Sequence, residues 1–138
     1  MGRLLAIDYG KKRTGIAVSD PLQLIAQGLT TVETPRLMKF LDDYLAHEEV
    51  ECIIVGMPRQ MNGLESENMQ RIRPFVNRLR HNHPDLTVDY YDERFTSVLA
   101  HRTMLESGIG KMARRDKALV DKISATIILE DYMESLKV

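Results

Sequence analysis

Two short apolar runs limit what this chain can fold into more than any other feature. Residues 4–7 and 52–56 contain no alternating polar positions, and the second run is rich in β-branched side chains. Strands of this composition are covered on both faces, as in the middle of a sheet with helices above and below it. The sequence therefore predicts a mixed α/β sheet covered on both faces.

Helices and strands alternate along the rest of the chain. Further strands are predicted at 15–18, 29–32 and 86–90, from short apolar runs or from strict alternation of apolar and polar residues. Helices are predicted to begin after Thr34, near residue 69, after residues 96–97 and at residue 117. Thr34 is expected to cap the first of them, with Pro35 at its first position.

Length and composition indicate one domain, 1–138. A chain of 138 residues with 43% hydrophobic and 28% charged residues is an ordinary globular protein. No apolar run approaches the roughly 20 residues that a membrane helix needs, and no signal peptide is recognisable, so we expect a cytoplasmic protein without membrane contact. The single cysteine, Cys52, is expected to be a core residue.

The first predicted strand ends at a carboxylate, Asp8, and a run of three cations, residues 11–13, lies in the turn that follows it. A carboxylate at the mouth of a buried hairpin is suited to holding a metal ion beside a phosphate. Aspartate is also a common turn-capping residue, so a purely structural role is equally compatible with this segment.

A second carboxylate, Asp121, lies on the apolar side of the last predicted helix. At 100° per residue it falls within roughly 40° of Ala125, Ile128 and Tyr132. Burial of a lone carboxylate costs several kcal/mol unless it is paired or bound to a cation. Asp121 is therefore expected either to bind a metal or to pair with a cation such as Lys122 or Arg94.

A third carboxylate, Glu93, directly follows the predicted strand at 86–90, in the segment Asp-Glu-Arg-Phe-Thr. Asp8, Glu93 and Asp121 together form a set of hard oxygen ligands without an accompanying Cys/His cluster, which favours Mg²⁺ or Mn²⁺ over Zn²⁺. Two such ions can activate a water and stabilise the leaving oxygen in phosphodiester cleavage.

Four ordered segments resemble the motifs of the YqgF family. They are Ala-Ile-Asp-Tyr-Gly (6–10) with Gly-Ile-Ala-Val-Ser-Asp (15–20), Ile-Val-Gly-Met-Pro (54–58) with Asn-Gly (62–63), Asp-Glu-Arg-Phe-Thr (92–96), and Val-Asp-Lys-Ile-Ser-Ala (120–125). Members are described as Holliday junction resolvase-like proteins and as candidate nucleases that process the 5′ end of pre-16S rRNA.

The resemblance implies a ribonuclease-H-like fold: a five-stranded mixed sheet in order 3-2-1-4-5, with strand 2 antiparallel and helices on both faces. It also implies that Asp8, Glu93 and Asp121 are catalytic and bind metal. Many nucleases of this fold carry an acid at the end of the fourth strand, but here that strand ends in Gly56-Met57-Pro58. Glu93 must then reach in from the neighbouring strand.

Basic residues that flank the three acids are expected to contact phosphates without recognising sequence. They are Lys11, Lys12, Arg13, Arg94, Arg114, Arg115 and Lys117. Tyrosines at 9, 90 and 91 are candidates for base stacking or for ordinary packing.

Three classes of function follow from these residues. The first is a metal-dependent endonuclease acting on structured RNA, such as precursor rRNA, or on branched DNA. The second is a nucleic-acid-binding module that no longer cleaves. The third is an actin-like ATP-binding domain, suggested by Asp8-x-Gly10 but disfavoured because the chain holds one such hairpin instead of two. A monomer or a weak homodimer is expected.

Overall fold

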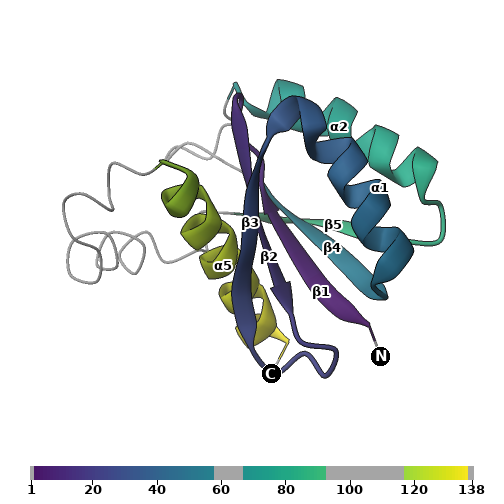
Figure 1. The fold of residues 1–138 in the computed structure, drawn as a ribbon, viewed down its shortest axis with the longest axis vertical. Helices are drawn as coiled ribbons and strands as arrows, with labels where there is room; N and C mark the ends of the chain where they lie inside the picture. Colours follow the sequence, from purple (N-terminus) through teal and green to yellow (C-terminus); the bar gives the residue numbers. More distant parts are fainter. Residues whose placement is uncertain (1, 58–66, 93–116, 137–138) are drawn as a thin grey trace.

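The computed structural model describes residues 2–57, 67–92 and 117–136 and shows a twisted sheet with helices on both sides (Figure 1). The strands are β1 (Arg3–Asp8), β2 (Arg13–Ser19), β3 (Ala26–Glu33), β4 (Val50–Met57) and β5 (Thr87–Asp92). The helices are the short 3-10 helix η1 (Thr34–Arg36), α1 (Leu37–His47), α2 (Met69–Asn82) and α5 (Lys117–Ser135).

The strand order is β3-β2-β1-β4-β5. Strand β2 is antiparallel to both of its neighbours, whereas β1, β4 and β5 are mutually parallel. This topology confirms the predicted order 3-2-1-4-5 with strand 2 antiparallel. The two uninterrupted apolar runs of the sequence form β1 and β4, which lie side by side in the middle of the sheet.

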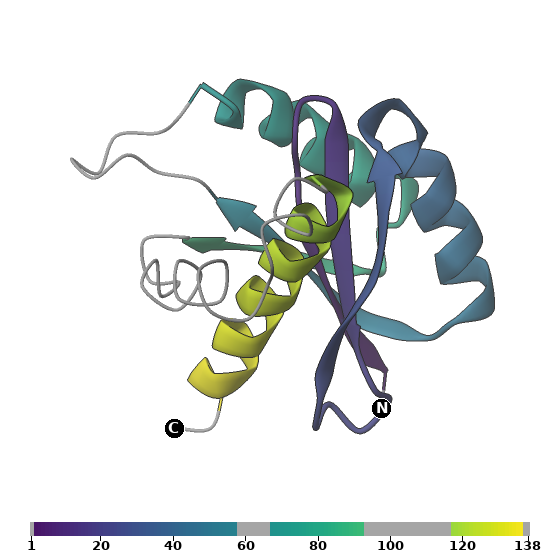
Figure 2. The same cartoon turned by 60° about the vertical axis from the view of Figure 1, so that its left-hand side comes forward.

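Helices cover the sheet unequally. Helices α1 and α2 pack on one face, against Leu5 and Ile7 of β1, and the single helix α5 packs on the other, against Leu4 and Ala6. Figure 2 shows α5 running along the face opposite α1 and α2. Successive residues of a strand point to opposite faces, so Asp8 belongs to the face that α5 covers.

Two predicted boundaries were wrong. The third strand extends over Ala26–Glu33, well beyond the predicted 29–32. The first helical segment begins as η1, whose N-cap residue is Glu33, and Thr34 makes no cap hydrogen bond there. Its hydroxyl is used elsewhere, as described below. Among the described helices, none is long and apolar enough to cross a membrane.

Candidate functional site

Asp8 stands at the carboxyl end of β1 on the α5 side of the sheet, partly exposed. Burial and, to a smaller extent, the negative charge of Asp121 together raise the pKa of its carboxyl group to about 6. Keeping this carboxylate ionised at neutral pH carries an electrostatic cost, because burial and the neighbouring carboxylate both disfavour its charged form. Acids with a strongly shifted pKa are frequent at functional sites.

Asp121 approaches Asp8 from the second turn of α5. Its Oδ2 accepts a hydrogen bond from Arg13 Nε at 3.1 Å, and its side chain is 25% exposed. Asp121 therefore points toward the sheet, as the helical spacing predicted, and it has a cationic partner. That partner is Arg13, 108 residues away in sequence.

Gly15 allows the two acids to come together. It pairs with Asp8 across β1 and β2, directly beneath α5. A Cβ atom at this position would lie 2.0 Å from the backbone oxygen of Asp121 and 2.3 Å from its carbonyl carbon. Any side chain here would collide with the helix backbone, so the missing side chain fixes how closely Asp121 approaches the strand.

The turn that follows Asp8 is held by side chains from two other elements. Thr34 Oγ1 donates to the carbonyl of Gly10 at 2.6 Å and lies 2.9 Å from Thr14 Oγ1. Asn68 Nδ2 donates to the carbonyl of Tyr9 at 2.8 Å. Sequence reasoning missed both anchors, because neither Thr34 nor Asn68 lies within a local motif that would place it beside residues 9–10.

The predicted basic residues divide into three groups. Lys11 and Lys12 are exposed on the turn, whereas Arg13 is held by its contact with Asp121. Lys117 is the first residue of α5. Glu93, Arg94, Arg114 and Arg115 lie outside the described residues, as does the side chain of Lys117, so their predicted roles stay predictions.

The three candidate stacking tyrosines make packing contacts. Tyr9 lies 5.1 Å from the ring of Phe75 between centroids, and Tyr91 meets Tyr132 edge-on at 6.0 Å. The guanidinium carbon of Arg80 stands 5.8 Å from the centroid of Tyr90. Of these, Tyr9 belongs to the turn beside Asp8, and its ring lies on the α1 and α2 side of the sheet.

The described part of the site supplies two carboxylates for a metal. Within the described ranges, no group of three His, Cys, Asp or Glu side chains is close enough to hold an ion. Asp8 and Asp121 nevertheless fit a hard divalent cation, because both are oxygen donors and their mutual repulsion raises the pKa of Asp8. Glu93, the predicted third ligand, follows Asp92, the last residue of β5.

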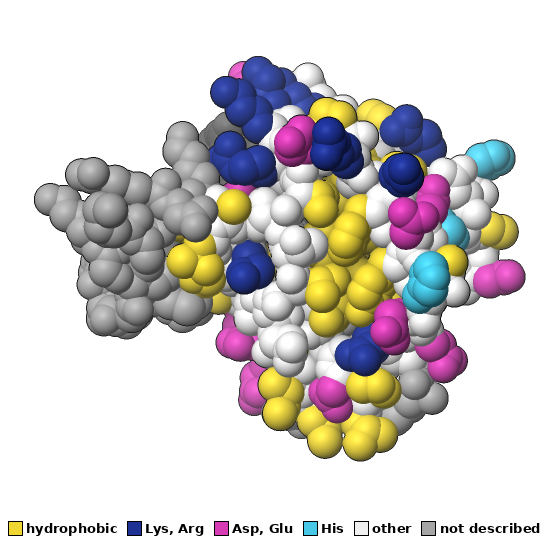
Figure 3. Space-filling view, viewed as in Figure 1, with side chains coloured by type: hydrophobic (Ala, Val, Ile, Leu, Met, Phe, Trp, Pro, Cys, Tyr) yellow, Lys and Arg dark blue, Asp and Glu magenta, His cyan; other side chains and the backbone are white. Residues whose placement is uncertain are grey.

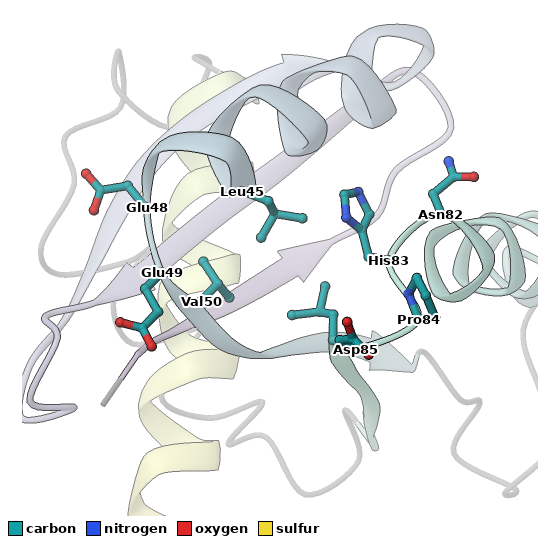
Figure 4. A pocket seen from close by; sticks show the side chains of 9 residues that line it. Leu45, Glu48, Glu49, Val50, Asn82, His83, Pro84 and Asp85 are labelled. Atoms are coloured by element: carbon teal, nitrogen blue, oxygen red, sulfur yellow. The ribbon is translucent and has the colours of Figure 1, made fainter.

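A cavity of about 460 Å³ lies at the opposite end of the sheet (Figure 4). It is lined by the end of α1, the residues that lead into β4 and the segment before β5, and these include Glu48, Glu49 and Asp85. His83 Nε2 at its rim lies 2.7 Å from Asp42 Oδ1. These acids repel phosphates, and ligands of open α/β sheets bind at the carboxyl ends of strands. The position of the cavity and its acidic lining thus both distinguish it from the Asp8 site.

Comparison with known proteins places this geometry in a family. The sequence model of RuvX, described as Holliday junction resolvase, matches residues 2–135. The chain belongs to the RuvX family. This confirms the YqgF resemblance drawn from the four motifs.

Curated relatives of the family are similar over their full length. The chain is 64% identical over 135 residues to the "Putative pre-16S rRNA nuclease" of Bacteroides thetaiotaomicron, covering 98% of each protein. It is 63% identical over 137 residues to the protein of the same name from Phocaeicola vulgatus, covering 99% of each.

A solved structure shares the fold. Thermus thermophilus RuvC in complex with a Holliday junction substrate aligns with a TM-score of 0.60 at 17% identity, covering 100% of this chain and 98% of that one. At this identity the likeness concerns the fold alone, and it confirms the predicted ribonuclease-H-like architecture.

Proposed function

We propose that this protein is a divalent-metal-dependent endonuclease that hydrolyses phosphodiester bonds of nucleic acid, with precursor 16S rRNA as its substrate. The observation that carries the proposal is that Asp8 and Asp121 come close to each other where α5 packs on the sheet. Two segments more than a hundred residues apart bring like charges together at the carboxyl end of β1, at an electrostatic cost. A structural role alone does not account for that cost, whereas a cation bound between the two carboxylates relieves it.

Asp8 and Asp121 would hold Mg²⁺ or Mn²⁺, and Glu93 is proposed as the third ligand. When bound, such an ion supplies an activated water and stabilises the charge on the leaving oxygen. Arg13 fixes the orientation of the Asp121 carboxylate through its 3.1 Å contact. The turn beyond Asp8 is anchored at both Tyr9 and Gly10, which keeps the carboxylate in place.

The raised pKa of Asp8 gives the reaction a pH dependence. With a pKa of about 6, the carboxyl group is mostly ionised at pH 7.5 and mostly protonated at pH 5. Protonation removes the charge that a hard cation needs. We therefore expect cleavage in subsaturating Mg²⁺ to decline as the pH falls toward 6, and saturating Mg²⁺ to move this decline to lower pH, because a bound cation lowers the pKa of its ligand.

Two nucleic-acid substrates are supported by different findings. The names of relatives at 63–64% identity point to pre-16S rRNA. The description of the family points to four-way DNA junctions, which makes a junction resolvase the second candidate. Exposed Lys11 and Lys12 suit either backbone, because phosphate contacts carry no sequence information. Arg94, Arg114, Arg115 and Lys117 are proposed as further phosphate contacts.

The test is cleavage of labelled precursor 16S rRNA and of a four-way DNA junction, each with Mg²⁺, with Mn²⁺ or with EDTA. Asp8→Asn and Asp121→Asn should each abolish cleavage, since asparagine keeps the volume but removes a ligand charge. Asp43→Asn, on the exposed side of α1, is the matched control and should cleave normally. Undiminished cleavage by either site variant, or by wild type in EDTA, would contradict the proposed chemistry.

A further inference from the structure

A groove on the other face of the sheet begins one residue beyond Asp8. It encloses about 420 Å³ between three walls: the turn after β1, the segment from η1 into α1, and residues 71–78 of α2. Its lining side chains are Tyr9, Lys11, Thr34, Pro35, Leu37, Met38, Arg71, Pro74, Phe75 and Arg78. Because consecutive Cα atoms are about 3.8 Å apart, Tyr9 brings this groove within one residue of the proposed reaction centre.

The charge of the groove is uniform. Lys11, Arg71 and Arg78 are exposed, and no Asp or Glu occurs among the described residues that line it. Arg71 and Arg78 lie seven residues apart on α2, about 10.5 Å along the helix axis. Figure 3 shows Lys and Arg side chains gathered along the upper edge of the molecule, beside hydrophobic surface. Such a surface attracts phosphates.

The groove also offers an aromatic surface. The rings of Tyr9 and Phe75 lie 5.1 Å apart between centroids at an interplanar angle of 39°. Phe75 is 6% exposed, so it supports the Tyr9 ring from below, and Tyr9 is the more accessible of the two. Positively charged grooves with aromatic side chains are how proteins hold single-stranded nucleic acid, because every base has a face that can stack.

The groove is fixed before any ligand binds. Asn68 at the start of α2 bonds the Tyr9 carbonyl, and Thr34 bonds the Gly10 carbonyl from the other side. Both walls are thus tied to the same turn, which also carries Asp8. A preformed site avoids the entropic cost of ordering its side chains and backbone on binding.

We propose that this groove binds a single-stranded segment of the nucleic acid adjacent to the phosphate that is cleaved. Lys11, Arg71 and Arg78 contact phosphates, and Tyr9 stacks on a base. The proposal rests on the proposed nuclease function, and it specifies that the substrate is unpaired on one side of the cleavage position. The nucleic acid strand then passes from one face of the sheet to the other over the turn between Asp8 and Lys11, at the carboxyl end of β1.

The test measures binding without cleavage. A fluorescein-labelled 12-nucleotide oligouridylate is titrated in EDTA with wild type, Arg71→Gln/Arg78→Gln and the control Arg36→Gln/Lys39→Gln, at several salt concentrations. The control removes the same charge from a neighbouring hollow that also contains Glu33 and Asp43. At a salt slope of about 0.7 per phosphate contact, loss of two contacts weakens binding about 25-fold at 0.1 M salt. The control should change it less than threefold.

The outcomes separate the groove from the nuclease proposal. A 25-fold loss confined to Arg71→Gln/Arg78→Gln, with a salt slope lower by about 1.4, supports the groove. Equal affinities for all three proteins, or an equal loss on a 12-base-pair RNA duplex, overturn it. If Asp8→Asn still cleaves while the groove variant loses binding, the nuclease site is wrong and the groove stands. Circular dichroism and thermal melting of each variant confirm that it is folded.

Discussion

Replacing Asp8 by asparagine should stabilise the folded protein at neutral pH while removing its proposed activity. In the folded state the pKa of this carboxyl group rises from 3.8 to about 6. The folded state therefore favours the neutral acid. The stability that this group contributes is fully present below about pH 4 and is lost as the pH rises through 6. Asparagine is neutral at every pH and does not suffer that loss.

The size of the effect follows from the shift. At about 1.4 kcal/mol per pKa unit, the change from 3.8 to about 6 corresponds to about 3 kcal/mol at pH 8. The Asp8 side chain is partly exposed, and solvent screening lowers the realised value. We expect Asp8→Asn to raise the free energy of unfolding by ~1–3 kcal/mol at pH 8, and by under ~1 kcal/mol at pH 4.5.

Urea denaturation followed by circular dichroism, in EDTA at the two pH values, measures this difference directly. Addition of Mg²⁺ at ten times its dissociation constant should then stabilise wild type by about 1.4 kcal/mol and Asp8→Asn by much less. Asp43→Asn, on the exposed side of α1, serves as the control. The reasoning fails if Asp8→Asn is no more stable than wild type at pH 8, or if its advantage is the same at both pH values.

Three further predictions test the surroundings of the site. Gly15→Ala should cost ~1–3 kcal/mol in urea denaturation and reduce cleavage. Gly28→Ala should be milder, because its Cβ would meet side-chain atoms of Lys122 and Thr126 instead of helix backbone, and the Lys122 side chain can move. Equal costs would contradict the close helix approach. Asp20→Asn should destabilise the protein at pH 7, with the loss shrinking as acid protonates the wild-type carboxylate, because backbone N–H donors led by that of Ile25 lower the pKa of Asp20. Burial raises the pKa of the Cys52 thiol to about 11, so iodoacetamide at pH 8 should label it only in urea.

The strand order could be predicted from the sequence because central strands carry their own signal. The uninterrupted runs at 4–7 and 52–56 required covering on both faces, and the motifs supplied the order. The third strand was predicted too short because Gly28 looks like a breaker. In the structure Gly28 lies within β3, and its missing side chain makes room for Lys122 of α5. That contact depends on the tertiary fold, which local propensity does not contain.

The candidate site was predictable to a similar degree. The inward orientation of Asp121 followed from helical periodicity, because Ala125 and Ile128 mark the buried side of the helix. Its pairing with Arg13 did not follow, since the two residues are 108 positions apart and Arg13 sits in a cationic run typical of phosphate binding. Thr34 shows the same difficulty. Threonine is a common helix-capping residue, but the Thr34 hydroxyl donates its hydrogen bond to the carbonyl of Gly10, 24 residues away in sequence.

The close approach at Gly15 has a consequence for how this site can vary. Strand β2 and helix α5 meet there without a side chain between them. The spacing of the two acids therefore depends on Gly15 having only a hydrogen atom as its side chain. A larger residue at this position would displace the whole helix, and Asp121 with it, instead of adjusting the site by a small amount. Substitutions at position 15 therefore cannot adjust the geometry of the two acids in small steps. Differences in function between related proteins have to arise from substitutions on the surrounding surface.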